Sequence, residues 1–130
     1  MAKLKMVHAV DPREELMAAL GDLSDIKIFN NYILVAVYKR PERLASGLFI
    51  SDVTRKEDDY QGKVGLVVKK GPLAFEDDDR TSFRGQNVDV GDWIAFRVSD
   101  GWSLEVNGVM CRMLQDIQIR LRLPAPDVIL

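Results

Sequence analysis

Apolar residues follow a helical spacing near the start of this 130-residue chain. Asp11 is suited to cap a helix, Pro12 fits its first position, and Glu14 stands at the reciprocal capping position. Leucines then recur at helical spacing as far as Gly21, a residue that commonly ends helices. The pattern predicts a helix over residues 12–20. Because so short a helix is marginal alone, we expect it to pack on its own domain or on a neighbouring subunit.

After this helix the pattern changes to β spacing. Residues 33–37 and 63–68 are continuous runs of β-forming residues, whereas residues 117–123 alternate apolar with polar side chains. Alternation with a period of two is typical of a strand with one buried and one wet face. Several short strands and one short helix predict an all-β fold, either a small barrel or a sandwich.

Three further short runs lie within residues 93–113. They are separated by Asp-Gly at residues 100–101 and by Asn-Gly at residues 107–108. Both dipeptides favour the positive φ angles of two-residue hairpin turns, whose twist matches that of the flanking strands. The spacing therefore predicts a meander of three strands joined by two hairpins.

Two long stretches interrupt the β pattern, namely residues 39–62, which are rich in charge, and residues 71–87. Both are longer than ordinary connections in a compact domain, and such loops usually carry function or are disordered. Residues 71–87 contain an acidic run without the alternating ligands and central glycine of a calcium loop, so we interpret it as a solvated, self-repelling tip. The run consists of Glu76, Asp77, Asp78 and Asp79.

Composition and charge argue against several classes of function. Eighteen Lys and Arg against 20 Asp and Glu give a net charge of −2, which is unfavourable for binding nucleic acid without sequence preference or for attachment to anionic lipid. One histidine, His8, and one cysteine, Cys111, are too few for a zinc site, and the chain has no phosphate-binding or dinucleotide glycine motif. We interpret Cys111 as a small buried apolar residue. We expect no enzymatic activity, cofactor, metal or nucleic-acid partner.

Hydrophobic segments are short throughout the chain. None approaches the roughly 20 residues that span a bilayer, and the first residues do not form a secretory signal. A single cysteine suits a reducing compartment. We therefore expect a cytoplasmic protein with no membrane partner.

An apolar triplet, Leu48, Phe49 and Ile50, follows Gly47 inside the charged stretch of residues 39–62. Leaving these side chains in water is unfavourable, since burying each stabilises by roughly 1.5–3 kcal/mol. One interpretation is a strand of the core. The other is a docking segment that orders in a hydrophobic groove of a partner, where modest single-site affinity would be multiplied by several copies on an oligomer.

The order of these features resembles the GroES-type co-chaperonin family over residues 26–123. Residues 30–35 resemble the family's first barrel strand, and residues 46–50 resemble the glycine-plus-three-aliphatics motif of its mobile loop. Residues 61–64 resemble the strand that follows, and residues 88–96 give the closest local match. Residues 71–87 occupy the place of the family's roof hairpin, with Glu76, Asp77, Asp78 and Asp79 at its tip.

The resemblance implies three parts: a small GroES-like β-barrel at residues 26–123, a helical arm at residues 1–25 and a tail at residues 124–130. It also implies that the final strand pairs with the first strand of the adjacent subunit in a homo-oligomeric ring. The interface residues would include Ile28, Tyr32, Ile117, Ile119 and Leu121. Gly47, Leu48, Phe49 and Ile50 would bind the apical domains of a GroEL-type chaperonin, so that the ring caps the chaperonin and assists protein folding.

The chain also departs from the family. The usual Pro-Leu-x-Asp-Arg opening reads here as Ile-Phe-Asn-Asn-Tyr at residues 28–32, and the arm and the tail have no counterpart. We therefore expect a remote relative and consider a phage gene as its source. The alternative is a structural or decoration protein of a phage capsid, located in the virion, whose arm and tail clasp neighbours. An oligonucleotide-binding barrel is a third hypothesis, for which the chain offers aromatic residues but no basic surplus.

Overall fold

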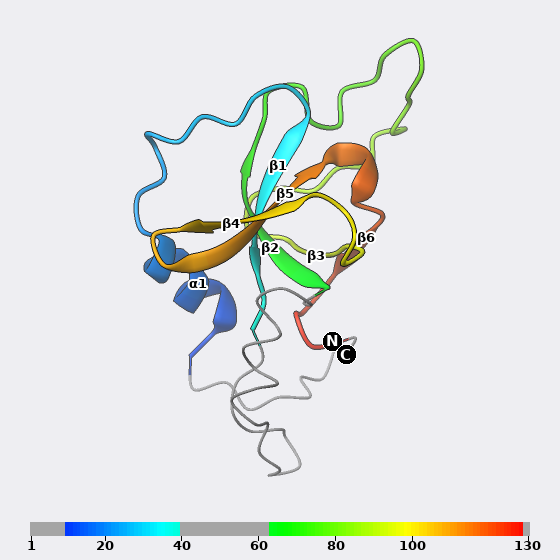
Figure 1. Cartoon of the computed structure of the whole chain (residues 1–130). Coiled ribbons are helices and arrows are strands. Elements are labelled where there is room, and N and C mark those ends of the chain that lie inside the picture. The colour runs from blue at the N-terminus through cyan, green and yellow to red at the C-terminus, as the bar shows by residue number, and fades with distance from the viewer. Residues whose placement is uncertain (1–9, 40–62, 129–130) are drawn as a thin grey trace.

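The computed structural model describes residues 10–39 and 63–128, which form one antiparallel sheet with a short helix beside it (Figure 1). The elements in chain order are α1 (Pro12–Leu20), β1 (Tyr32–Val37), β2 (Val64–Lys70), β3 (Trp93–Ala95), β4 (Trp102–Val106), β5 (Val109–Gln115), the 3-10 turn η1 (Asp116–Gln118) and β6 (Leu121–Leu123).

The sheet has six strands in the order β4-β5-β1-β2-β3-β6, and every neighbouring pair is antiparallel. β4 and β6 are its two edges and do not pair with each other in the described residues. The predicted all-β class therefore agrees with the structure at the level of an antiparallel sheet with one helix, whereas the sheet is open and no closed barrel is shown.

The predicted helix is confirmed as α1. Asp11 accepts a hydrogen bond from the backbone N–H of Arg13 at 2.9 Å, and Gly21 ends the helix with a φ of 70°. Leu20 is buried in the core beneath the helix, and Asn107 Nδ2 donates to its carbonyl oxygen at 2.7 Å. The helix thus packs on its own domain, against β2 and β5.

The core lies on both faces of β1, which explains its unbroken apolar sequence. Leu34 and Ala36 belong to one cluster of buried side chains, whereas Ile33, Val35 and Val37 belong to another on the opposite face. α1 contributes to the first cluster through Leu20. Buried Cys111 lies in this first cluster, as expected for a small apolar residue.

The predicted meander is only half correct. Asn107 and Gly108, with φ values of 51° and 83°, form the turn between β4 and β5. β3, however, pairs with β2 and β6 and does not pair with β4, so the hairpin predicted at residues 100–101 is wrong. Residues 97–101 instead form a loop whose backbone is hydrogen-bonded to the side chain of Arg112 on β5.

The final predicted strand is also shorter than its alternating pattern indicates. Residues 116–118 form η1, and only residues 121–123 pair with β3 as β6. Gln118 folds back so that its Oε1 accepts from the backbone N–H of Gln115 at 2.8 Å, and Asp116 is drawn inward by hydrogen bonds. Side-chain capping therefore overrides the local β pattern at this point.

Candidate functional site

Residues 71–87, between β2 and β3, project from the end of the sheet and are called the projection below (Figure 1). Asp78 Oδ1 accepts from the backbone N–H groups of Arg80 and Thr81 at 2.8 and 2.7 Å, and Asp77 Oδ1 accepts from Phe83 N at 2.6 Å. The acidic run is exposed, as a solvated tip would be. Two of its carboxylates nevertheless build the turn itself, so the tip has a defined shape.

Two aromatic rings fill the inner side of the projection. Phe75 and Phe83 pack edge to face with ring centroids 5.3 Å apart, an arrangement that favours aromatic pairs. Phe75 also packs against the second core cluster. Its φ of 62° is unusual for a residue with a side chain and costs about 1–2 kcal/mol, which the surrounding contacts must offset.

The base of the projection is attached to the segment that leads into β1. Gly71 N donates to Tyr32 O at 2.8 Å, and Leu73 N donates to Asn30 O at 2.9 Å. A β-carbon at residue 71 would lie 2.3 Å from Asn30 O, so the close approach requires glycine. Lys70 ties the far end of the projection by donating to Val88 O at 2.7 Å.

Asp116 is the buried carboxylate at this junction, with 3% of its surface exposed. Its Oδ1 accepts from Asn31 Nδ2 at 3.0 Å, and its Oδ2 accepts from the backbone N–H of Phe75 at 3.0 Å. Its own backbone N–H donates to Asn31 O at 3.1 Å. One side chain therefore joins three segments that are far apart in the sequence.

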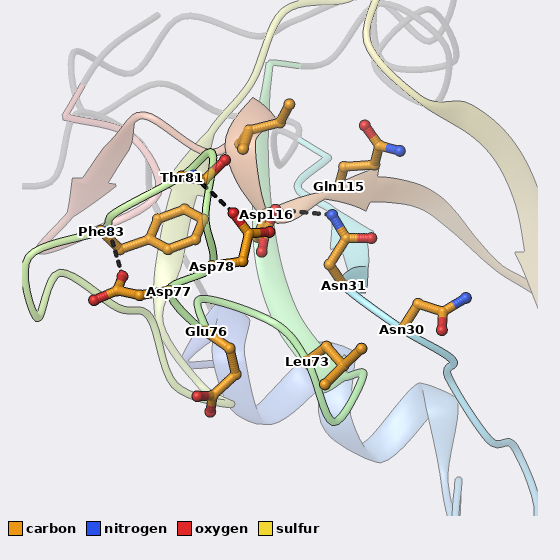
Figure 2. Close-up of a pocket in the computed structure, with 11 residues that line it drawn as sticks. Asn30, Asn31, Leu73, Glu76, Asp77, Asp78, Thr81, Phe83, Gln115 and Asp116 are labelled. Atoms are coloured by element: carbon orange, nitrogen blue, oxygen red, sulfur yellow. Dashed lines mark hydrogen bonds between the residues drawn. The ribbon is translucent and has the colours of Figure 1, made fainter.

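A polar depression of about 640 Å³ lies beside this junction (Figure 2). Figure 2 shows Asp116 between two walls, with the amides of Asn31 and Gln115 on one side and the carboxylates of Asp77 and Asp78 on the other. Its lining consists of Asn30, Asn31, Leu73, Glu76, Asp77, Asp78, Thr81, Phe83, Gln115, Asp116 and Ile117. Across residues 10–39 and 63–128, no group of three or more side chains is placed to hold a metal ion. The depression thus offers hydrogen-bonding groups and negative charge.

Arg112, on β5, is a second buried charged group, with 5% of its surface exposed. Its Nη1 donates to Val98 O at 2.5 Å and to Asp100 O at 2.8 Å, and its guanidinium lies over the ring of Phe96. Burial lowers the pKa of Arg112, and the negative charge of Asp100 partly opposes this shift. Because Arg112 fixes backbone carbonyls, its role is to hold the loop of residues 97–101.

A second depression, of about 660 Å³, lies between the projection and β6 and is called the edge groove below. Phe75 and Phe83 line one side, and Arg120, Leu121 and Arg122 line the other. Arg120 and Arg122 form long ion pairs with Asp100 and Asp92, at 3.4 and 3.9 Å. The groove therefore combines apolar and basic groups along an edge strand of the sheet.

The structure does not leave β1 free for the predicted pairing with the final strand of an adjacent subunit, because β1 is already paired on both sides, with β5 and β2. The five predicted interface residues occupy different environments in one copy of the chain. Ile28 is buried in the first core cluster, and Tyr32 packs partly buried against it. Ile119 packs partly buried against the second cluster. Ile117 and Leu121 are 52% and 48% exposed, so these two retain the most side-chain surface for a partner.

The predicted docking residues lie outside the described residues. Gly47, Leu48, Phe49 and Ile50 all fall within residues 40–62. The described chain ends before this segment at residue 39 and resumes at residue 63, at one end of the β1–β2 pair.

Sequence reasoning missed Asp116, Arg112 and Asn31. Asp116 and Arg112 are polar residues beside apolar strand positions, which is the only local signal that either carries. Asp116 and Asn31 are 85 residues apart, and Arg112 acts on a loop that was expected to be a hairpin. No local pattern could have paired them.

Comparison of the sequence with models of protein families gives no match, and comparison with curated proteins gives none either. In the part of the chain that the structure describes, no helix has both the length and the apolar character needed to cross a membrane.

Proposed function

We propose that the protein is co-chaperonin-like: a GroES-like β domain that assembles into a ring and caps a GroEL-type chaperonin. Leu48, Phe49 and Ile50, with Gly47 before them, dock on the apical domains. The projection, with its acidic tip, closes the cavity. Hydrolysis of ATP belongs to the chaperonin, so this protein needs neither a nucleotide nor a catalytic group.

The observation that carries the proposal is the placement of two long connections at opposite ends of the β1–β2 pair. Val37 pairs with Gly65 at the end where residues 38–63 connect the two strands. Ile33 pairs with Lys70 at the other end, where the projection begins. A strand of seven residues spans about 20 Å, so the two connections leave the β1–β2 pair at points separated by the length of the strands. A cap needs this separation, because one end must hold the chaperonin while the other closes the opening.

The shape of the projection gives further support. A roof must keep its form without a continuous sheet beneath it. The turn built by Asp77 and Asp78, together with the packed rings of Phe75 and Phe83, provides that form within one chain. The exposed carboxylates would keep the tip hydrated and discourage it from sticking to an enclosed apolar polypeptide.

Docking through an apolar triplet explains how a weak contact becomes a stable cap. Each large side chain contributes roughly 1.5–3 kcal/mol when buried, and ordering the segment offsets much of that gain. One copy would therefore bind modestly and dissociate readily. Several copies on one ring bind together because the later contacts form intramolecularly.

Replacing Phe49 by Ala tests this function directly. We expect binding of the assembled protein to an ATP-bound chaperonin to weaken at least about tenfold, because one large apolar anchor is lost from every copy. The thermal unfolding temperature should stay unchanged. Binding is measured by co-sedimentation or interferometry, and stability by calorimetry.

Phe29→Ala is the matched control, since Phe29 is 71% exposed and lies in another part of the chain. It should leave both the affinity and the unfolding temperature nearly unchanged. An unchanged affinity of Phe49→Ala together with a large loss of stability would instead place the triplet in a core strand and refute docking.

A decoration protein of a phage capsid is the alternative. The described part of the arm packs on its own domain, since α1 contacts β2 and β5 and Leu20 is buried in the core. An arm held in this way supports the co-chaperonin over a clasp on neighbours. Purification separates the two functions: a co-chaperonin is recovered with a chaperonin in the presence of ATP, whereas a decoration protein is recovered with a particle shell.

A further inference from the structure

Asp116 connects two parts of the molecule that have different tasks in the proposed function. Through Oδ2 it holds the backbone N–H of Phe75, at the root of the projection. Through its main chain it begins η1, which leads to β6 after only two residues. Ile119 N donates to Asp116 O at 3.1 Å and Gln118 caps Gln115, so this link is itself hydrogen-bonded.

We propose that Asp116 is a positioning residue that couples the projection to the edge strand β6. This inference rests on the proposed function in that β6 is the strand taken to join subunits. A neighbour that fixes β6 also fixes η1, and the Asp116 carboxylate passes this restraint to Phe75. Assembly would thereby set the angle of the roof.

The chemistry of the junction requires a carboxylate. Both groups that face the side chain, Asn31 Nδ2 and Phe75 N, are donors. A carboxylate has an acceptor for each of them, whereas an asparagine in the same place would direct its own NH₂ group at one donor. The Phe75 N–H is held in a left-handed backbone conformation, with φ 62°, and would lose the partner that keeps it there.

Limited trypsin cleavage of the full-length folded protein tests the coupling, because Arg80 and Arg84 lie in the projection and are exposed. Asp116→Asn should speed cleavage at these two sites by about tenfold, since local opening governs the rate when a hydrogen bond to a charged group is lost. Cleavage sites are identified by mass spectrometry. Hydrogen exchange of the β1 and β2 amides should stay at the wild-type rate.

Glu76→Gln is the matched control, because it removes one negative charge from the same depression without touching the junction. Its cleavage rate should equal that of the wild type.

Asn31→Ala removes one of the two donors to Asp116 and keeps the contact between Asp116 and Phe75. It should therefore also speed cleavage, by a smaller factor than Asp116→Asn. If Asp116→Asn does not fold, the cleavage rate of Asn31→Ala decides the question. Wild-type cleavage rates in both junction variants would overturn the inference. Acceleration of β1 and β2 exchange by the same factor as cleavage would also overturn it, because Asp116 would then be a general stabiliser.

Assembly is examined by the same cleavage at concentrations above and below ring dissociation. The wild-type assembly should protect Arg80 and Arg84 relative to its monomer, whereas Asp116→Asn should lose this difference. Equal protection in the two proteins would contradict the coupling. A wild type that is monomeric at every concentration would refute the ring of the proposed function, while cleavage of the monomeric variants would still decide how Asp116 positions the projection.

Discussion

Cys111 illustrates at the scale of one residue how burial alters a chemical property without creating a site. Its side chain is wholly buried on β5, and desolvation raises the pKa of the thiol from 9.0 to about 11. A thiol with so high a pKa is protonated at neutral pH and is a poor nucleophile. This is consistent with Cys111 serving as a small core residue.

The raised pKa predicts how stability changes at alkaline pH. The unfolded thiol ionises near 9.0, before the folded thiol at about 11, so the unfolded state loses its proton first as the pH rises. The contribution of the thiol is therefore complete below pH 9 and is lost between pH 9 and pH 11, up to about 2–3 kcal/mol. Cys111→Ala has no thiol, so its free energy of unfolding lacks this pH-dependent contribution. The difference in unfolding free energy between wild type and variant should shrink over that range in urea titrations, whereas parallel profiles would contradict the assignment.

Gly101 shows which constraints on a single residue cannot be inferred from the sequence. Asp-Gly at residues 100–101 correctly indicates a positive φ, which is 67° at Gly101. It does not reveal that a β-carbon there would lie 2.1 Å from Met113 O, nor that the chain continues away from β3. Local dipeptides encode backbone conformation, whereas pairing partners depend on contacts made across the sheet.

At the scale of elements, the strength of the local signal decides how well each element could be predicted. α1 has a cap, a proline at its first position and a terminal glycine, and its predicted bounds agree with the structure. β1 and the first five residues of β2 are continuous apolar runs because both of their faces are buried. Residues 117–123 alternate equally clearly, but η1 interrupts them, because Gln118 and Asp116 find hydrogen-bond partners that the alternation cannot anticipate.

The candidate site was predictable only in outline. Its acidic run and its length mark residues 71–87 as unusual, whereas the junction beneath them depends on Asn31 and Asp116, which no spacing relates. The edge groove likewise arises from the fold, since Phe75 and Leu121 meet across it only when β6 pairs with β3.

The docking of α1 makes the arm part of the domain, and this can be measured. Leu20→Ala should destabilise the protein by about 2–4 kcal/mol, because Leu20 is 1% exposed and its loss leaves a cavity under the helix. Val10→Ala, at an exposed position just before the helix, should change stability by less than about 0.5 kcal/mol. Both values come from urea unfolding at neutral pH. Equal, small losses in the two variants would mean that the arm is attached without contributing to the core.

At the scale of the whole molecule, the net charge of −2 hides an uneven distribution. Acidic groups gather at the tip of the projection, whereas Arg120 directly precedes β6 and Arg122 lies within it. The carboxylates at the tip of the projection favour exposure to solvent. The edge strand β6 favours a partner that offers apolar and acidic groups. An open edge strand with an exposed Leu121 is an aggregation hazard in a monomer, and assembly would remove it.

Leu121→Lys tests whether β6 joins copies of the chain. In a ring, the lysine would enter every interface, removing apolar contact and adding a charge that must be desolvated, at a cost of about 2 kcal/mol or more for each. We expect the native mass, measured by mass photometry over a dilution series, to fall toward that of the monomer at concentrations where the wild type stays assembled. The stability of the single domain should change by less than about 0.5 kcal/mol, because Leu121 is 48% exposed in one chain. Val10→Lys introduces the same charge at another exposed position and should keep the wild-type mass. If Leu121→Lys assembles as the wild type does, the subunits meet elsewhere, and the exposed edge of β6 has another use.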